Sequence, residues 1–243
     1  MEQLDQVAAI LAMTMGAAWA SGINLYAAIL VLGLMGSTGN VDLPPGLEIL
    51  SDPLVLFAAG AMYCVEFFAD KIPGIDTGWD MMHTFVRIPA GAMMAMGAVG
   101  EVDPVVGLAA GIMGGGLAAT THAAKAGSRA IINTSPEPFT NWTASVAEDV
   151  AVVAGLWTAL NHPVLFLVLM VLFILLMIWM LPKLWRGIKR VAAKLRALFG
   201  GKEAPPEPEP VTPATITAES IDPQPKEPPD KSAGASSGDT AAR

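Results

Sequence analysis

Long apolar stretches separated by short polar connections dominate the first 182 residues of the chain. Most of them are close to the ~20 residues that a helix needs to cross the hydrocarbon core of a bilayer. They occupy residues 4–35, 53–69, 84–100, 105–124, 143–160 and 164–181. The pattern predicts an all-α fold, a polytopic transmembrane helix bundle of about six spans over residues 1–182. The composition agrees, because 53% of the residues are hydrophobic and only 15% are charged.

The C-terminal part of the chain has a different character. Residues 183–200 interleave basic and apolar side chains at roughly helical spacing, which predicts a basic amphipathic juxtamembrane helix whose positions 183–196 contact anionic lipid headgroups. An ordinary stop-transfer anchor is the alternative. Residues 201–243 are rich in proline and acidic residues and poor in large apolar ones, so we expect a disordered tail there.

The basic residues also predict an orientation. Lys71 and Arg87 flank the second connection, Lys125 and Arg129 begin the fourth, and more basic residues follow the last span, whereas the other connections have none. Because cytoplasmic loops carry an excess of Lys and Arg, six spans place both termini in the cytoplasm.

The first span is long enough to need a break or a strong tilt. Its 32 residues would extend roughly 48 Å as a helix, well beyond the hydrocarbon core. We expect a helix break at Ser21, Gly22 and Asn24; a tilted continuous helix is the alternative. Similar small-residue runs and proline-bearing loops in the two halves of the chain are compatible with two inverted three-helix halves with interrupted helices, the arrangement found in many transporters.

Ionisable residues at the ends of the apolar stretches are the candidate site, because a charge in or beside lipid is costly and needs a reason. Helical spacing places several of them on shared faces near the predicted cytoplasmic side. The candidate ion- or substrate-binding residues are Glu66, Asp70, Asp76, Asp80, His83, His122, Glu148 and Asp149. Their candidate charge partners are Lys71, Arg87, Lys125 and Arg129. An alternative interpretation is that these partners form ion pairs with the acids only to fix the fold.

These residues resemble a family. The run from Glu66 through Asp70-Lys71-Ile72-Pro73, Asp76, Asp80 and Arg87, followed by His122, Lys125, Arg129, Ser145 and Glu148-Asp149, is similar to a bacterial integral-membrane family known as the domain of unknown function DUF4126. The resemblance covers about residues 4–160 and implies a bacterial inner-membrane location. It implies no biochemical activity. It departs at Asn24, where many family members carry Arg.

Three classes of function fit the sequence, in this order. The first is a transporter or channel for a small ion or small solute, with a carboxylate-rich polar site near the cytoplasmic side. The second is a membrane scaffold that recruits partners, and the third is an enzyme acting on a lipid headgroup, for which no catalytic motif is present. We expect the lipid bilayer as a partner and no nucleic acid, and the Gly-rich helix faces are compatible with a homo-oligomer. The sequence predicts no cofactor and leaves the question of a metal open.

Overall fold

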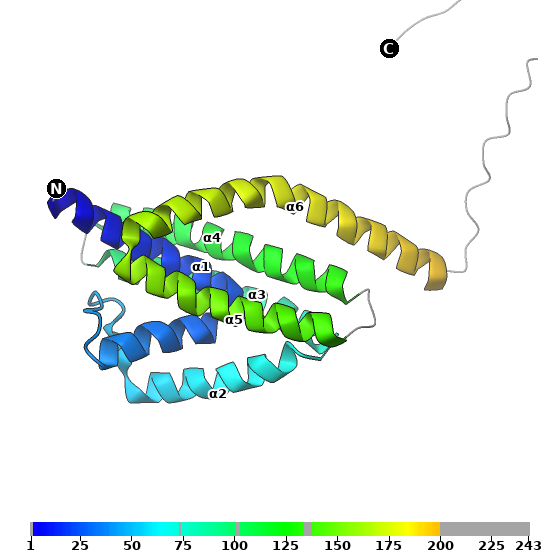
Figure 1. Cartoon of the computed structure of the whole chain (residues 1–243), viewed down its shortest axis with the longest axis horizontal. Helices are drawn as coiled ribbons and strands as arrows, with labels where there is room; N and C mark the ends of the chain where they lie inside the picture. The colour runs from blue at the N-terminus through cyan, green and yellow to red at the C-terminus, as the bar shows by residue number, and fades with distance from the viewer. Residues whose placement is uncertain (1, 73, 101–102, 134–137, 200–243) are drawn as a thin grey trace, which may run out of the picture. The chain divides into compact units, whose positions relative to one another are not determined.

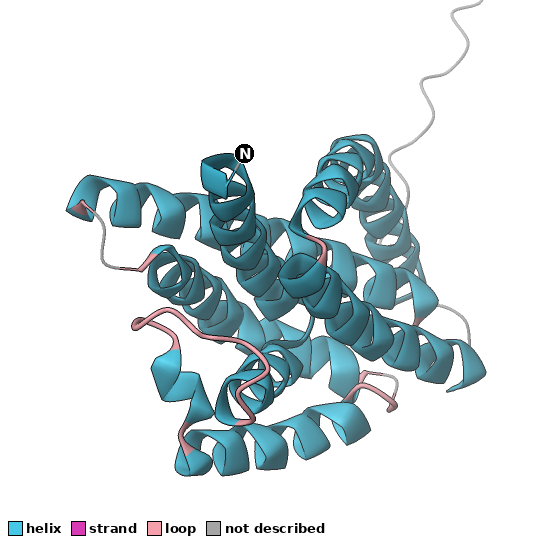
Figure 2. Ribbon diagram, turned by 60° about the vertical axis from the view of Figure 1, so that its left-hand side comes forward, coloured by secondary structure: helices cyan, strands magenta, loops and turns pink. Residues whose placement is uncertain are grey.

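The computed structural model of the protein describes residues 2–72, 74–100, 103–133 and 138–199. Within these ranges the chain forms helices and no strand (Figure 1, Figure 2). The helices are α1 (Glu2–Ser37), the short 3-10 helix η1 (Glu48–Ser51), α2 (Pro53–Ala69), α3 (Ile75–Val99), α4 (Pro104–Ile132), α5 (Pro138–Asn161) and α6 (Pro163–Phe199). The predicted all-α helix bundle is confirmed. The predicted disordered tail lies outside the described residues.

Two helices begin where the local sequence favours a helix start. The side chain of Asp52 accepts hydrogen bonds from the backbone N–H groups of Leu54 and Val55 at the start of α2, and Asp103 accepts one from Val105 at the start of α4. In both helices a proline follows the aspartate. An Asp cap with Pro at the first helical position is a preferred N-terminus, because Pro has no N–H group to leave unpaired.

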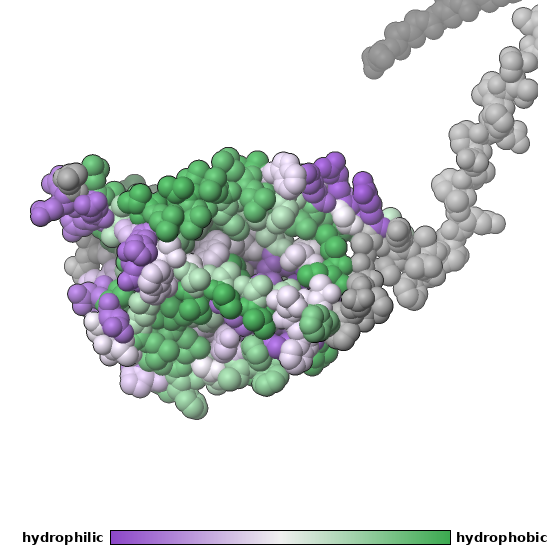
Figure 3. Space-filling view, viewed as in Figure 1, coloured by the Kyte–Doolittle hydropathy of each residue, from purple (hydrophilic) through white to green (hydrophobic). Residues whose placement is uncertain are grey.

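The helices have the length and composition of membrane spans. Helices α1, α4, α5 and α6 are each long and apolar enough to cross a bilayer, and α2 is a shorter apolar helix of 17 residues. Figure 3 shows hydrophobic residues over much of α6 and the middle of the viewed face, with hydrophilic residues gathered toward the ends. The chain is therefore a membrane protein.

Helix α1 turns back on itself at Asn24, which has a non-helical φ of −145° and ψ of 99°. Figure 1 shows the second half of α1 returning toward the end of the bundle from which the first half came. The contacts agree, because Val7 of the first half and Val99 of α3 line one cavity, and Gly46, in the loop after α1, packs on Gly97. The six predicted spans include this stretch as one crossing of the bundle, and the reversal replaces that crossing by a helical hairpin.

The break in α1 is held against the middle of α3 and α4 by close packing of small residues. A Cβ atom on Gly22 would lie 2.5 Å from the carbonyl oxygen of Ala118, and one on Gly91 would lie 2.5 Å from the Cβ of Ala118. Ser21 also donates a 3.0 Å hydrogen bond to the carbonyl oxygen of Arg87. Glycine is needed at both positions because any side chain there would collide with α4.

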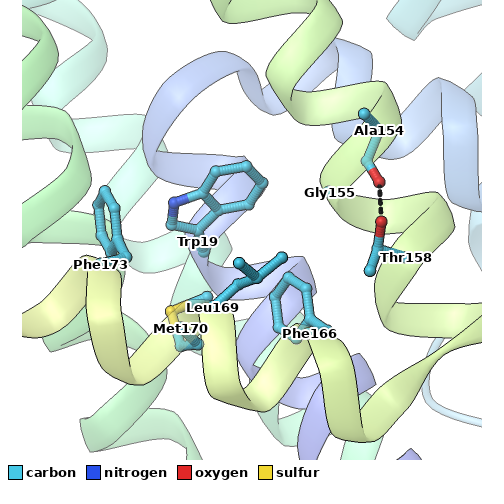
Figure 4. Close-up of a pocket in the computed structure, with 8 residues that line it drawn as sticks. All are labelled: Trp19, Ala154, Gly155, Thr158, Phe166, Leu169, Met170 and Phe173. Carbon is cyan, nitrogen blue, oxygen red and sulfur yellow. Dashed lines mark hydrogen bonds between the residues drawn. The ribbon is translucent and has the colours of Figure 1, made fainter.

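Aromatic packing fixes α6 against α1. The Trp19 ring contacts Phe166 and Phe173 edge to face, with ring centroids 6.4 and 6.2 Å apart, beside a cavity of about 250 Å³ (Figure 4). Gly155 of α5 lets the Trp19 ring approach, since a Cβ there would come within 2.7 Å of a ring carbon. This cavity is lined by none of the predicted site residues, so it belongs to the packing of α1, α5 and α6.

Helix α6 continues through Pro182 to Phe199, so the predicted last span and the predicted juxtamembrane helix form one helix. Beyond Pro182, the apolar side chains of Leu184 and Ile188 face Gly127 of α4. This packing ties the basic part of α6 to the end of α4. The inverted relation of two three-helix halves stays a prediction.

Candidate functional site

Seven ionisable side chains from α2 to α5 meet inside the bundle, in a group that we call the charge cluster. Eight ion pairs of 4.0 Å or less connect its members. The side chain of Glu148 is 18% exposed, and the other six are at most 4% exposed. The members are the carboxylates Glu66, Asp70, Asp80 and Glu148 and the cations Arg87, Lys125 and Arg129.

Arg87, on α3, links a carboxylate of α2 to a carboxylate of α3. One terminal nitrogen of its guanidinium donates to Glu66, and the other donates to Asp80 at 2.9 Å. The guanidinium and both carboxylates are buried. Two charge-assisted hydrogen bonds from one planar fork fix the geometry as well as the charge of this part of the cluster.

Lys125 lies at the centre of the charge cluster. Its Nζ atom lies 2.8 Å from a carboxylate oxygen of Asp70, 3.3 Å from Glu66, 3.4 Å from Glu148 and 3.8 Å from Asp80. A single ammonium group therefore contacts all four carboxylates. One turn later on α4, Arg129 donates from Nη2 to Glu148 at 2.7 Å and closes the cluster on the side of α5.

The charge cluster holds more negative than positive charge. Its four carboxylates face three cations, so one negative charge is left when all are ionised. Among the described residues, the buried oxygens Glu66 Oε2, Asp70 Oδ1 and Asp80 Oδ2 have no hydrogen-bond partner. Buried polar atoms are nearly always hydrogen-bonded, so three such oxygens in one cluster are unusual.

His122 borders the cluster as a neutral side chain. Its Nδ1 atom lies 3.2 Å from Nη1 of Arg87, and because a guanidinium can only donate, Nδ1 must accept. The proton is then on Nε2, which donates to the Thr84 hydroxyl at 2.7 Å, and Thr84 donates in turn to the carbonyl oxygen of Asp80. The hydrogen-bond network thus assigns the tautomer, and His122 adds no charge to balance the acids.

The chain also matches a known protein family. Residues 11–183 match the model of a family described as "Domain of unknown function (DUF4126)", a stretch that contains the whole charge cluster and most of the described helices. The chain belongs to this family. The resemblance stated from the sequence is confirmed, and it supplies no activity. No curated protein and no solved structure matches the chain.

In this DUF4126 protein, Asp149 lies apart from the charge cluster although it follows Glu148. Its two oxygens accept hydrogen bonds from the Asn24 amide at 2.9 Å and the Tyr63 hydroxyl at 3.0 Å. The carbonyl oxygen of the same Asn24 amide accepts from the backbone N–H of Ala27 at 3.0 Å. Asp149 is thus held by neutral donors at the break in α1, where the helix leaves backbone groups that need partners.

The predicted site residues Asp76 and His83 lie outside the charge cluster, where they link α3 to neighbouring helices. Asp76 accepts hydrogen bonds from backbone N–H groups at the start of α3 and from the Asn133 amide at 2.8 and 2.9 Å, so it ties α3 to the end of α4. His83 stacks on Trp79, and its Nε2 atom lies 3.0 Å from the Tyr26 hydroxyl. Neither side chain has an ion pair with a described residue of this DUF4126 protein.

Lys71, in the connection between α2 and α3, also lies outside the cluster. Its Nζ donates to the carbonyl oxygen of Phe67 at 2.9 Å and lies 2.8 Å from the centroid of the Phe67 ring, with the Ser145 hydroxyl 3.5 Å away. Burial lowers the pKa of this ammonium group from its ordinary value, because the charged form loses hydration. If Lys71 and Asp149 are added to the charges of the cluster, their opposite charges cancel and the excess of one negative charge is unchanged.

The neutral partners that complete these sites carry no signal in the sequence. Tyr63, Thr84, Asn133 and Asn141 each contribute a hydrogen bond to a predicted residue or to its partner. Such side chains are common in transmembrane helices, and no spacing marks them as members of a site. The ionisable residues are rare there, which is why the sequence revealed them in this DUF4126 protein.

Proposed function

We propose that this protein is a transporter or channel for protons or another small monovalent cation in the bacterial inner membrane, with the charge cluster as its ion-binding site. The observation that carries the proposal is the excess of one buried carboxylate over the cations that face it. A buried charge without a partner is costly, so a bound proton or a monovalent cation would balance the cluster. A divalent cation would leave the cluster with an excess of one positive charge.

The unpartnered oxygens support the same site. Glu66 Oε2, Asp70 Oδ1 and Asp80 Oδ2 have lone pairs that no described residue uses. Carboxylate oxygens are ligands for hard cations and acceptors for a proton. Lys125 contacts all four carboxylates, so its ammonium group would move among them as one carboxylate is neutralised and another is released.

Glu148 is the access point in this proposal. It is the most exposed member of the charge cluster and contacts both Lys125 and Arg129. An ion that arrives at Glu148 weakens these two contacts and frees the cations to satisfy the deeper carboxylates. Ionisable residues within membrane spans commonly mark such ion pathways.

Asp149 provides a second proton acceptor at the break in α1. Unlike the members of the charge cluster, it is held by an amide and a hydroxyl rather than by a cation. When Asp149 is protonated, its new O–H group can donate to the Tyr63 oxygen once that hydroxyl rotates, so both protonation states keep a hydrogen bond. This reversibility suits a residue that takes up and releases protons during transport.

The proposed orientation follows the basic residues. The connection that holds Lys71 and the extension of α6 with Lys183 and Arg186 lie at one end, which we assign to the cytoplasm. From the reversal of α1 we infer that the N-terminus, which carries the acidic residues Glu2 and Asp5, lies on the other side of the membrane. This proposed orientation differs from the one expected from six single crossings, which placed both termini in the cytoplasm.

Flux measurements on purified protein in liposomes test the proposal. The wild-type protein should dissipate an imposed pH gradient, or a Na⁺ or K⁺ gradient, faster than empty liposomes. Glu148→Gln should slow the flux by about tenfold or more, since a lost charge-assisted hydrogen bond is worth about 1.5–3 kcal/mol. Glu48→Gln is the matched control, because Glu48 is exposed on η1 and far from the cluster in sequence. Wild-type liposomes that are no leakier than empty ones to all three ions would refute the proposal.

A second pair of variants tests the role of Asp149. Asp149→Asn removes the exchangeable proton but keeps a side chain of the same shape beside Asn24 and Tyr63. We expect proton flux to fall by about tenfold or more, because the charge-assisted hydrogen bonds of the carboxylate are lost. The control Asp42→Asn, at an exposed position in the loop after α1, should leave proton flux unchanged. Equal flux in both variants would remove Asp149 from the pathway.

A further inference from the structure

A large apolar groove lies between α1, α4 and α6, on a part of the bundle that the proposed function does not use. Its volume is about 620 Å³, within the range of ligand-binding pockets. None of the residues that line it belongs to the charge cluster. Residues that line its three walls include Val7, Ile10, Met113, Leu117, Ile174 and Ile178.

The shape of the groove follows from the sequence of its walls. Gly114 and Gly116 of α4 face it and contribute no side chains, and Figure 1 shows α6 arching over the neighbouring helices. A Cβ on Gly114 would collide with Ala95 of α3, so this glycine is needed for packing, but a Cβ on Gly116 would meet no atom within 4 Å. The groove thus opens beside Gly116, and the surface around this opening is made of apolar side chains. Such a surface is expected where a protein faces the acyl chains of a bilayer.

Basic side chains follow directly where the groove ends on α6. Leu181 is a lining residue, and the exposed Lys183, Arg186, Lys189 and Arg190 come after it with no acid between them. Leu184 and Ile188 turn toward Gly127 of α4, which leaves the charged side chains of this segment pointing away from the bundle. The Lys183 ammonium lies 3.0 Å from the centroid of the Trp179 ring. Trp and Lys together are typical of the membrane–water interface.

We propose that the groove binds an acyl chain of an anionic phospholipid from the leaflet at the basic end of the bundle, with the lipid phosphate beside Lys183 and Arg186. The apolar walls fit the chain, and the run of basic residues at its mouth complements the charge of the headgroup. A phosphate group accepts the charge-assisted hydrogen bonds that Lys and Arg donate. The proposal does not depend on transport activity, so each can fail without the other.

Gly116→Phe tests the groove, because the open position lets an aromatic ring enter the space without displacing protein atoms. The matched control is Gly107→Phe on the same helix, where a Cβ also meets nothing within 4 Å but the residue does not line the groove. The readout is native mass spectrometry of detergent-purified protein incubated with phosphatidylglycerol or phosphatidylcholine. Gly116→Phe should lower retention of both lipids by about tenfold, the effect of displacing two buried methylene groups, and Gly107→Phe should not.

The double variant Lys183→Gln/Arg186→Gln tests the headgroup contact. It should lower retention of phosphatidylglycerol by about tenfold or more, since each basic residue near an anionic lipid is worth roughly 1 kcal/mol, and leave phosphatidylcholine unchanged. Equal retention of phosphatidylglycerol by wild type, Gly116→Phe and the double variant would overturn the proposal. The proposal would also be overturned if wild type ran as a dimer and Gly116→Phe as a monomer with unchanged lipid retention, because the groove would then be an interface between two copies of the chain.

Discussion

Replacing Arg87 by leucine tests whether the charge cluster is essential to the fold. Arg87 is 0% exposed and is paired with two carboxylates, Glu66 and Asp80, which are 0% and 1% exposed. Its loss also removes the donor to His122. The variant therefore buries two carboxylates with only Lys125 left in ion-pair contact with both, and the excess negative charge of the cluster rises from one to two.

The expected size of the effect follows from the cost of breaking a buried pair. Removing one partner of such a pair costs about 3–5 kcal/mol, because the remaining charge has lost both its hydration and its counter-ion. At about 2–4 °C per kcal/mol for a protein of this size, the thermal midpoint should fall by roughly 6–20 °C. A leucine is a good helix former, so the change in helix propensity is small by comparison.

The assay is the thermal midpoint in detergent, followed by the intrinsic fluorescence of the six tryptophans. Arg190→Leu is the matched control, because Arg190 is exposed on the extension of α6 and should change stability by no more than about 0.5 kcal/mol. Adding Glu66→Gln to Arg87→Leu should recover part of the loss, with a coupling energy of about 0.5–3 kcal/mol. A midpoint for Arg87→Leu within about 2 °C of wild type, or strictly additive effects in the double variant, would refute the reasoning.

Three further changes probe other parts of the fold. Gly22→Ala should destabilise the protein by about 1–3 kcal/mol, because the added methyl group would lie 2.5 Å from a carbonyl oxygen of α4, whereas Gly107→Ala, in open space, should not lower the thermal midpoint. Thr84→Val leaves the Nε2–H of His122 without its acceptor and should cost about 1–3 kcal/mol; Thr158→Val, whose hydroxyl bonds only within its own helix, should stay near wild type. A protease-cleavable tag at the N-terminus should be cut when protease is added to intact spheroplasts, whose outer membrane has been opened, and cleavage only after lysis would contradict the orientation proposed from the reversal of α1.

Helical spacing and the rarity of charge in apolar segments pointed to all seven members of the charge cluster, together with predicted residues that lie outside it. Glu66 lies in the last turn of α2 and Asp70 caps that helix four residues later, and Lys125 and Arg129 are four apart on α4, so each pair lies on one side of its helix. The adjacent residues Glu148 and Asp149 point in different directions on α5, and accordingly only Glu148 joins the cluster. The periodicity of a helix determines such relations without knowledge of the tertiary fold.

The parts that the sequence did not determine depend on contacts between segments far apart in the chain. Asp76 was grouped with the acids, yet backbone N–H groups at the start of α3 and the Asn133 amide bind it, and no charge pattern indicates this. The break at Asn24 was expected from the length of the first span. The reversal at that break could not be expected, because its direction depends on the contacts of Gly22 and Ser21 with α4 and α3.

The reversal of α1 links the proposed ion site to the architecture. A straight first helix would keep its backbone groups paired along its whole length, whereas the hairpin leaves Asn24 at the turn, where its amide binds both Asp149 and the backbone of Ala27. A non-helical residue is tolerated among membrane helices only where protein or water satisfies it. The carboxylate of Asp149 is therefore part of what makes the turn possible, and a change in its protonation alters the hydrogen bonding of the turn directly. If the protein transports ions as proposed, the accompanying movement would begin at Asn24, where the helix hairpin, the Asp149 carboxyl group and the helix that carries Glu148 meet.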